Sequence, residues 1–251
     1  MILEALNYAA TYPLTSAEHR RAIRYSVNLQ ARASRCAVHW AQHEANTKAA
    51  ILDAARRCRQ RRTAVVLGSG LLRDVPIRVL RSLFDTVVLI DLVHLASVRA
   101  GLWLKRSGQV RLIERDLSGL QQLRAGEPVE PLGFLRQVPY LDLVVSANLL
   151  SQIVTGSRRT LAAEMAEADI DAMLAELVKA HLDGIRGIAA ETCLISDIHY
   201  RVIDRNGRVH EDVDMLAGVA LLTPRAEWDW PVVPFGEESP DYQVVHRVNV
   251  I

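Results

Sequence analysis

The stretch VVLGSGLLRDVP, residues 65–76, decides the fold of this chain. An apolar run leads directly into Gly68-Ser69-Gly70, and Pro76 suits the first turn of a following helix. Glycines at such a turn let the backbone bend sharply and let a ligand approach main-chain N–H groups at the helix N-terminus. The stretch therefore predicts a strand, a ligand-binding turn and a helix in succession.

Further apolar runs repeat this pattern along the chain. Each is short, rich in Val, Leu or Ile and without strict alternation, as in strands buried on both faces of a parallel sheet. Helical stretches separate the runs, and this alternation predicts a doubly wound, mostly parallel α/β sheet of Rossmann-like type. The expected strands are TAVVLG (63–68), TVVLID (86–91), VRLIERD (110–116) and LDLVVSAN (141–148), and the expected helices cover 76–83, 93–105 and about 117–123.

The rest of the chain predicts a helix followed by β structure. A long amphipathic helix is expected over 159–182 and a fifth strand over 191–198. An Asn-Gly pair between β-prone runs predicts a tight hairpin within 200–210. The run at 242–251 predicts a terminal strand, whereas the aromatic, turn-rich stretch 223–240 is expected to be a loop.

The N-terminal part has a different texture. Residues 16–62 contain no Gly or Pro and predict two or three helices. We expect an N-terminal helical segment, 1–62, acting as a lid or interface, ahead of an α/β domain over 63–251. Residues 1–62 hold 11 Lys and Arg against 4 Asp and Glu. A solvated basic face explains this excess, and contact with an anionic substrate or nucleic acid is the alternative.

The global composition excludes several classes of protein. The formal net charge of +1 does not demand a polyanionic partner. Cys36, Cys58 and Cys193 are too few and too scattered for a disulfide framework. There is no basic flank before an apolar N-terminal stretch and no apolar run of about 18 residues. We therefore expect a cytoplasmic protein with no membrane association.

Asp91 strengthens the interpretation of the glycine turn. It ends the second expected strand about 20 residues beyond Gly70, where a carboxylate can accept hydrogen bonds from both ribose hydroxyls of a nucleoside. This unit predicts a cofactor such as NAD or S-adenosylmethionine (SAM). A third glycine of the NAD fingerprint would stand at Arg73, which disfavours NAD. The structural alternative is a glycine turn and a strand-end Asp that caps the next helix.

Two later segments extend this pattern, and with them the chain resembles the class I SAM-dependent methyltransferases over about 61–251. The resemblance does not point to a specific subfamily. Asp116-Leu117 stands where the family places an acidic residue beside the adenine amino group, and LDLVVSANLLSQI (141–153) resembles its fourth-strand motif. The terminal strand matches the family's antiparallel seventh strand. The resemblance implies SAM as cofactor. The cofactor-binding residues it implies are Gly68, Ser69, Gly70, Arg73, Asp91, Leu92, Asp116, Leu117, Ser146, Ala147 and Asn148.

Two positions depart from the family pattern. Val66 stands where an acidic residue is common, and Leu72 where a further glycine is common. Arg73 and Asp74 follow, and they either hold the carboxylate and amino groups of the cofactor or pair with each other. The first hypothesis is a methyltransferase with a small-molecule acceptor. The alternatives are a binding or partner subunit without catalysis and an RNA or protein methyltransferase using the basic helices; an NAD-dependent oxidoreductase ranks after them.

The resemblance implies that acceptor-facing residues come from the N-terminal helices and from loops after strands four and five. Asp197 and His199 are the preferred base or acceptor-binding pair, with Tyr200 as a third candidate. The alternative is that these are ordinary polar residues between a strand and a hairpin. Homo-oligomerisation stays open.

One helical pattern invites a metal hypothesis. Cys36, His39 and His43 fall on one face of an expected helix. A metal would need a further ligand, and no second cluster is evident. We therefore expect no metal there and prefer a mixed buried face that includes Trp40.

Overall fold

The computed structural model describes residues 2–105 and 108–251. Its sheet has the strand order β3-β2-β1-β4-β5-β8-β7, with β6 pairing β5 off this path. The strands from β3 to β5 are parallel, and β8 is antiparallel to both β5 and β7. The strands are β1 (Thr63–Leu67), β2 (Thr86–Asp91), β3 (Val110–Glu114), β4 (Leu141–Ala147), β5 (Glu191–Asp204), β6 (Val209–Asp214), β7 (Ala226–Val233) and β8 (Tyr242–Val250).

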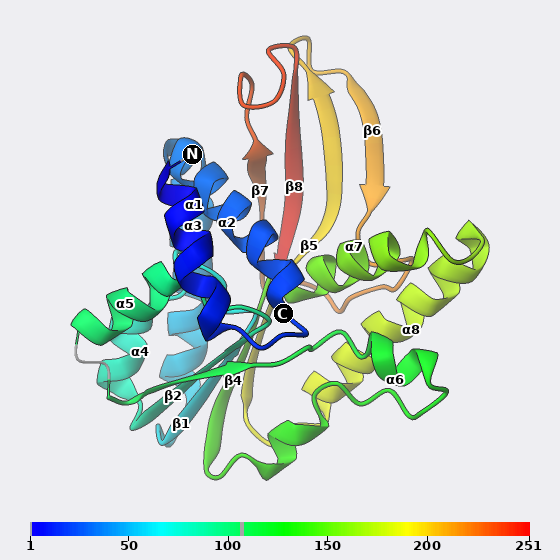
Figure 1. Cartoon of the computed structure of the whole chain (residues 1–251). Coiled ribbons are helices and arrows are strands. Elements are labelled where there is room, and N and C mark those ends of the chain that lie inside the picture. Colours follow the sequence, from blue (N-terminus) through cyan, green and yellow to red (C-terminus); the bar gives the residue numbers. More distant parts are fainter. Residues whose placement is uncertain (1, 106–107) are drawn as a thin grey trace.

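Helices cover both faces of this sheet (Figure 1). One face packs against α3, α4 and α5, and the other packs against α7 and α8. The doubly wound, mostly parallel Rossmann-like fold with an antiparallel C-terminal strand and N-terminal helices is confirmed. The helices are α1 (Ile2–Thr11), α2 (Arg20–Arg35), α3 (Ala37–Arg57), α4 (Ile77–Leu83), α5 (Ala96–Leu104), α6 (Leu120–Arg124), α7 (Leu149–Leu161) and α8 (Glu167–Arg186), with short 3₁₀ helices at Tyr12–Leu14 and Gly133–Gln137.

The antiparallel strands form an arm that projects beyond the parallel strands (Figure 1). The last pair between β4 and β5 is Ala147 with Ile195, and β5 continues to Asp204. A bulge between Asp197 and His199 marks the point where β5 leaves β4 and pairs only with β8 and β6. Bulges redirect side chains at such transitions, and this one lies at the carboxyl edge of the parallel sheet.

The expected loop at 223–240 was wrong in part, because β7 occupies its first half. Trp228 and Trp230 turn from this strand toward α3, and their burial stabilises the pairing of β7 with β8. Pro231 is tolerated because β7 is the outermost of the described strands of the sheet, where it pairs with β8.

The single long helix expected over 159–182 was also wrong. The chain leaves α7 after Leu161 and starts α8 at Glu167, although the residues between them are good helix formers. Buried Leu161 and Ile170 belong to one apolar cluster, so tertiary packing overrides the local propensity. Arg158 forms ion pairs with Glu167 and Asp171 across the turn.

Candidate functional site

The glycine turn after β1 brings β1 against the end of β4. Gly68 and Gly70 have φ values of 70° and 48°, in the left-handed region that glycine adopts freely. A Cβ atom on Gly68 would lie 2.9 Å from the carbonyl oxygen of Ala147. The turn therefore sits between β1 and β4, where the order of the strands reverses and doubly wound folds bind their ligands.

Leu72 keeps the backbone path of a glycine without being one. Its φ is 58°, a conformation that costs a non-glycine residue about 1 kcal/mol. The side chain packs against the apolar core on the α3 face. Leu72 replaces the glycine that is common at this position in the methyltransferase family, but the backbone keeps the turn that a glycine would adopt.

Asp91 closes the turn from the end of β2. Its Oδ2 accepts the Gly70 N–H at 2.7 Å, and its Oδ1 accepts the Leu92 N–H at 2.7 Å. Burial raises the pKa of this carboxyl group. The Val93 N–H also stabilises this carboxylate, and a carboxylate with four acceptor positions and three backbone donors can still accept from a ribose hydroxyl. Within residues 2–105 and 108–251, the buried Ser69 Oγ has no hydrogen-bond partner.

The turn and the ends of β2 and β3 therefore suit a nucleoside. A buried hydroxyl without a partner and a strand-end carboxylate with open acceptor positions are the groups that its ribose would engage. Asp116 and Leu117 follow β3 at the same edge of the sheet; Asp116 Oδ1 accepts the Ser118 N–H at 2.8 Å, and Leu117 is buried. Leu92 is partly exposed beside Asp91.

Arg73 points elsewhere. Its Nε lies 2.6 Å from Glu44 Oε1 of α3, so the guanidinium ties the glycine turn to the N-terminal helices. Burial raises the pKa of the neighbouring Asp74 to about 6. Arg73 thus pairs with Glu44 of the protein itself. The ion pair between Arg73 and Asp74, one of the two alternatives predicted from the sequence, is not found among the described residues.

The three expected residues at the end of β4 face different ways. Ser146 Oγ lies 3.0 Å from His181 Nε2 of α8, on the sheet face away from α3. Ala147 offers its carbonyl oxygen to the glycine turn. Asn148, with a φ of 50°, lies on the α3 side, where its amide Nδ2 is 3.3 Å from His43 Nε2.

A buried polar cluster surrounds Asn148 between α3 and the sheet. We call it the β4–β8 cluster, because it spans the end of β4 and the middle of β5 and of β8. Its polar members are all buried or partly buried, and two indole rings border it. It consists of His43, Asn148, Ser151, Asp197 and His246, with Trp228 and Trp230.

His43 is neutral in this cluster. Burial lowers its pKa to about 4. The Trp228 indole N–H donates to His43 Nδ1 at 3.1 Å, so the ring hydrogen of the neutral imidazole is on Nε2. That hydrogen is accepted when the Asn148 amide turns its oxygen toward the ring. The same orientation satisfies Asn148 Oδ1, which otherwise is buried without a partner among the described residues.

Asp197 pairs with His246 and not with His199. Its Oδ2 accepts hydrogen bonds from His246 Nδ1 at 3.0 Å and from Ser151 Oγ at 3.2 Å. His199 is exposed, and its Nδ1 lies 3.1 Å from Asp212 of β6. Tyr200 stands beside His246, with ring centroids 6.0 Å apart. The bulge in β5 separates the two residues that the sequence placed together.

His246 and Ser151 were missed by the acceptor-site prediction. His246 is the polar exception on a face of β8 that otherwise carries buried Val248 and Val250, and this exception was the available signal. The pairing partner of β8 is not encoded locally. Only the sheet order brings residues this far apart in sequence into contact with Asp197.

The cysteine and histidines of the metal hypothesis do not converge. Cys36 is buried at the junction of α2 and α3, His39 is exposed, and His43 is buried in the β4–β8 cluster. In the part of the chain that the structure describes, no group of three His, Cys, Asp or Glu side chains is placed to hold a metal ion. Nor is any described helix both long and apolar enough to cross a membrane.

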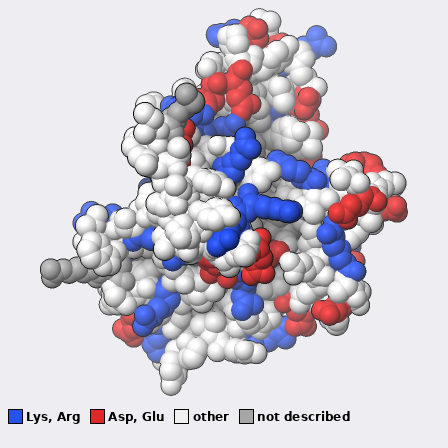
Figure 2. All heavy atoms as spheres, in the orientation of Figure 1, with Lys and Arg blue, Asp and Glu red and all other residues white. Residues whose placement is uncertain are grey.

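Several arginines of the basic N-terminal segment are used internally. Arg35 lies 2.6 Å from Glu237 in the loop between β7 and β8, and Arg32 pairs with Glu238 of the same loop. Other basic side chains gather where the start of α2 lies beside α7 (Figure 2), and Arg159 stacks over the Tyr25 ring at 4.9 Å. The basic excess is thus partly structural.

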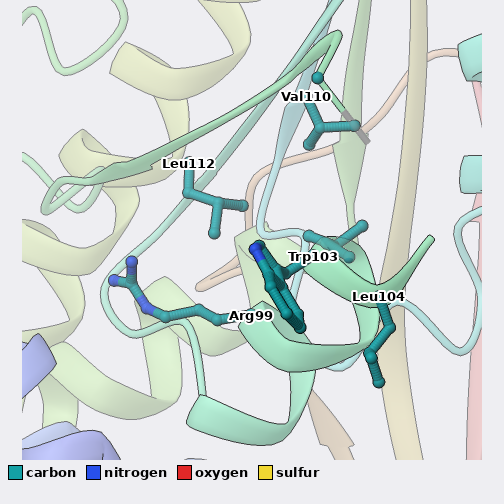
Figure 3. A pocket seen from close by; sticks show the side chains of 7 residues that line it. Arg99, Trp103, Leu104, Val110 and Leu112 are labelled. Atoms are coloured by element: carbon teal, nitrogen blue, oxygen red, sulfur yellow. The ribbon is translucent and has the colours of Figure 1, made fainter. Parts of the chain in front are cut away.

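A separate cavity of about 620 Å³ lies between α5 and the edge strand β3. Trp103 stands between Arg99 and Leu104 and faces the strand (Figure 3). Trp103 as a whole residue is 78 % exposed. The lining residues are Arg99, Leu102, Trp103, Leu104, Gly108, Val110 and Leu112, and they include none of the residues of the glycine turn or the β4–β8 cluster.

Solved structures similar to this chain include SAM-dependent methyltransferases, and several contain bound SAM or S-adenosylhomocysteine (SAH). The N-methyltransferase NodS from Bradyrhizobium japonicum WM9, in complex with SAH, shares 13 % identity at a TM-score of 0.40, covering 83 % of this chain and 86 % of NodS. The precorrin-6y C5,15-methyltransferase from Geobacter metallireducens GS-15 shares 12 % identity at a TM-score of 0.35, covering 81 % and 86 %.

The glycopeptide N-methyltransferase MtfA, complexed with SAM, shares 15 % identity at a TM-score of 0.33, covering 80 % of this chain and 75 % of MtfA. No protein-family model and no curated protein sequence matches the chain. At these TM-scores the likenesses are loose, and the fold assignment rests on the strand order and directions themselves.

Proposed function

We propose that this chain is a SAM-dependent methyltransferase acting on a small-molecule acceptor. The observation that carries the proposal is the meeting of Gly70 N–H with Asp91 Oδ2 at the reversal of strand order, next to the β4–β8 cluster. A nucleoside site and a polar site thus share one edge of the sheet.

Each part of this edge has a task. Asp91 and Ser69 would hold the ribose, Asp116 and Leu117 would border the adenine, and the end of β4 at Asn148 would face the methionine portion. SAM, when bound, supplies an electrophilic methyl group on a sulfonium. The protein's own contribution is to fix the acceptor in line with that group and to exclude water.

The N-terminal helices are proposed to be the lid of this site. Ile23 and Val27 of α2 pack on Val93 and Leu95, which follow β2 directly after Asp91. The Arg73–Glu44 ion pair adds a second tie between α3 and the glycine turn. Ligand entry would then require α2 to move relative to the end of β2.

A small acceptor is favoured because the polar groups of the site are enclosed. Asp197 is 5 % exposed and His43 is 3 % exposed, so an acceptor must bring its reacting group beneath α3. The pairing of Arg32 and Arg35 with Glu238 and Glu237 leaves fewer free cations on α2 for a phosphate backbone. Both features weigh against a large nucleic-acid substrate.

Calorimetry with SAM, SAH and NAD tests the proposal. We expect SAM and SAH to bind more tightly than NAD, and Asp91→Ala to weaken both by about 10- to 100-fold through lost hydrogen bonds to a charged group. Asp85→Ala is the matched control, since Asp85 is exposed just before the opposite end of β2. Wild-type protein that is folded and binds neither SAM nor SAH would refute the proposal.

A further inference from the structure

We propose that Asp197 and His246 form a proton-accepting pair in this site, and that the group methylated there is a hydroxyl. This inference rests on the proposed methyltransferase function and assigns the chemistry of its acceptor. It gives His246 the role of the group that receives the acceptor's proton and makes Asp197 the residue that orients it.

The geometry fixes which nitrogen of His246 is available. Nδ1 faces the carboxylate of Asp197 at 3.0 Å, and a carboxylate oxygen accepts, so the neutral ring carries its hydrogen on Nδ1. The lone pair is then on Nε2, and this atom has no hydrogen-bond partner within the described ranges. The side chain of His246 is 14 % exposed, against 7 % for that of Asp197, so it is the more open member of the pair.

Asp197 is itself held in place. Ser151, in the first turn of α7, donates to the same oxygen that receives His246 Nδ1–H. A carboxylate that fixes the tautomer and orientation of an imidazole also stabilises the imidazolium that forms when the ring takes a proton. Ser151 and Asp197 therefore act as positioning residues for His246.

His43 is unsuited to the same task. Its Nδ1 is occupied by the Trp228 N–H, and its Nε2 faces the Asn148 amide. Burial also lowers its pKa to about 4. The titratable groups that face His246 are Asp197 and Tyr200 from β5 and His43 from α3, while β7 contributes the uncharged Trp230. His246 is the one among these imidazoles with a nitrogen open to a ligand.

Two buried polar atoms next to His246 lack partners in the described structure. Asp197 Oδ1 is an acceptor, and Trp230 Nε1 is a donor. The Trp230 and His246 rings are 5.8 Å apart and nearly edge to face. Buried polar groups are normally satisfied, so these two atoms are open to polar groups of a bound ligand.

The need for a base selects a hydroxyl over an amine. A neutral amine already presents its lone pair, whereas a hydroxyl is a poor nucleophile until its proton is removed. In the proposed step the O–H proton goes to His246 Nε2 and the oxygen lone pair forms the new bond to the methyl carbon, while the carbon–sulfur bond breaks and its electrons stay on sulfur. The imidazolium then releases the proton to solvent.

The first test is the tautomer of His246. In protein labelled with nitrogen-15 at histidine, we expect the neutral ring of His246 to carry hydrogen on Nδ1. Asp197→Asn should change that signal, because an amide no longer restricts Nδ1 to donating. His210, paired with Asp204 through Nε2 at 2.9 Å, is an internal comparison and should be the opposite tautomer. Hydrogen on Nε2 of His246 in the wild type would overturn the proposal.

The second test uses 4-nitrophenol as a coloured hydroxyl probe in protein saturated with SAH. When His246 takes the proton of the bound probe, the positive imidazolium stabilises the phenolate. We therefore expect the bound probe to turn to phenolate at a pH at least about one unit lower than the free dye does. His246→Gln should still bind the probe but abolish that shift. His210→Gln, which alters a His–Asp pair at the hairpin end of the β5–β6 arm, is the matched control and should behave as the wild type.

Each other outcome has a definite meaning. An unshifted wild-type titration, an unchanged shift in His246→Gln, or no perturbation of the His246 signals by the probe would each overturn the hydroxyl assignment. Perturbation by 4-nitrobenzylamine in place of 4-nitrophenol would assign an amine instead and overturn it as well. SAH binding is measured on the same samples. If the wild type does not bind SAH, the methyltransferase proposal is refuted. If the wild type binds SAH and the probe tests fail, only the assignment of a hydroxyl acceptor is refuted.

Discussion

The imidazole of His43 lies flat on the indole of Trp230, with ring centroids 3.8 Å apart and ring planes 7° apart. His43 belongs to α3, and Trp230 belongs to the edge strand β7. Trp228 of the same strand donates its indole hydrogen to His43 Nδ1. One histidine thus joins the N-terminal helices, the outer edge of the sheet and, through Asn148, the end of β4.

Removing the Trp228 hydrogen bond should destabilise this junction. Trp228→Phe leaves His43 Nδ1 buried without its donor, and we expect a loss of about 1–3 kcal/mol in the free energy of unfolding. Denaturant titration measures it. Trp103→Phe is the control, because Trp103 is largely exposed and should change stability by less than about 0.5 kcal/mol. Equal losses in the two variants would contradict the assigned hydrogen bond.

The close approach of β1 and β4 predicts a strong effect of Gly68→Ala. The added methyl group would meet the Ala147 carbonyl oxygen at 2.9 Å, in addition to the strain of a positive φ. Gly207→Ala has the same kind of φ, but no atom within 4 Å of the added carbon, and it should cost about 1 kcal/mol from strain alone. A Gly68→Ala loss no larger than that of Gly207→Ala, by thermal or chemical unfolding, would contradict the contact.

The Arg73–Glu44 pair predicts coupled stability effects. We expect Arg73→Ala and Glu44→Gln each to cost about 0.5–1 kcal/mol, with the double variant costing less than the sum of the two. SAH affinity should change little in Arg73→Ala if the guanidinium serves α3. Strict additivity in unfolding experiments, or a large loss of SAH affinity, would show that Arg73 acts on another group.

Buried His181 predicts a pH dependence of stability. Burial lowers its pKa from 6.5 to about 4, so between these values the unfolded chain binds a proton that the folded chain does not. Stability contributed by the neutral ring is therefore full above pH 6.5 and falls as the pH drops toward 4, by about 3 kcal/mol in total. Asp74, whose pKa burial raises to about 6, acts in the opposite direction over part of this window.

The contribution of His181 is isolated by His181→Gln. Urea unfolding from pH 7 to pH 4.5 should show a shallower loss of stability in this variant than in the wild type, because Gln cannot take up the proton. Asp74 is present in both proteins and cancels in the comparison. His199→Gln replaces an exposed histidine and should follow the wild-type slope. Parallel slopes for His181→Gln and the wild type would contradict the assignment.

The parallel half of the sheet could be predicted from the sequence because its strands are buried on both faces. Runs such as 86–91 are apolar throughout, and the glycine turn and Asp91 mark their carboxyl ends. The edge strand β7 could not be found in this way. Its burial alternates irregularly around Pro231, and only its pairing with β8 makes it a strand.

Some residues of the candidate site could likewise be predicted from local sequence, whereas others depend on strand pairing. The glycine turn, Asp91 and Asn148 follow from local order along the chain, since each ends or follows a strand of the parallel sheet. The partner of Asp197 was placed at His199 because the two are neighbours in sequence. The bulge in β5 and the antiparallel pairing with β8 bring in His246 instead, and both are non-local features.

The most direct test of the methyltransferase account is a crystal structure of the chain with SAH. The account predicts the ribose hydroxyls on the carboxylate of Asp91, the adenine beside Asp116 and Leu117, and the sulfur near Asn148 on the side of the β4–β8 cluster. SAH bound elsewhere, or crystals that hold none at saturating concentration while Asp91 keeps only its backbone partners, would contradict it.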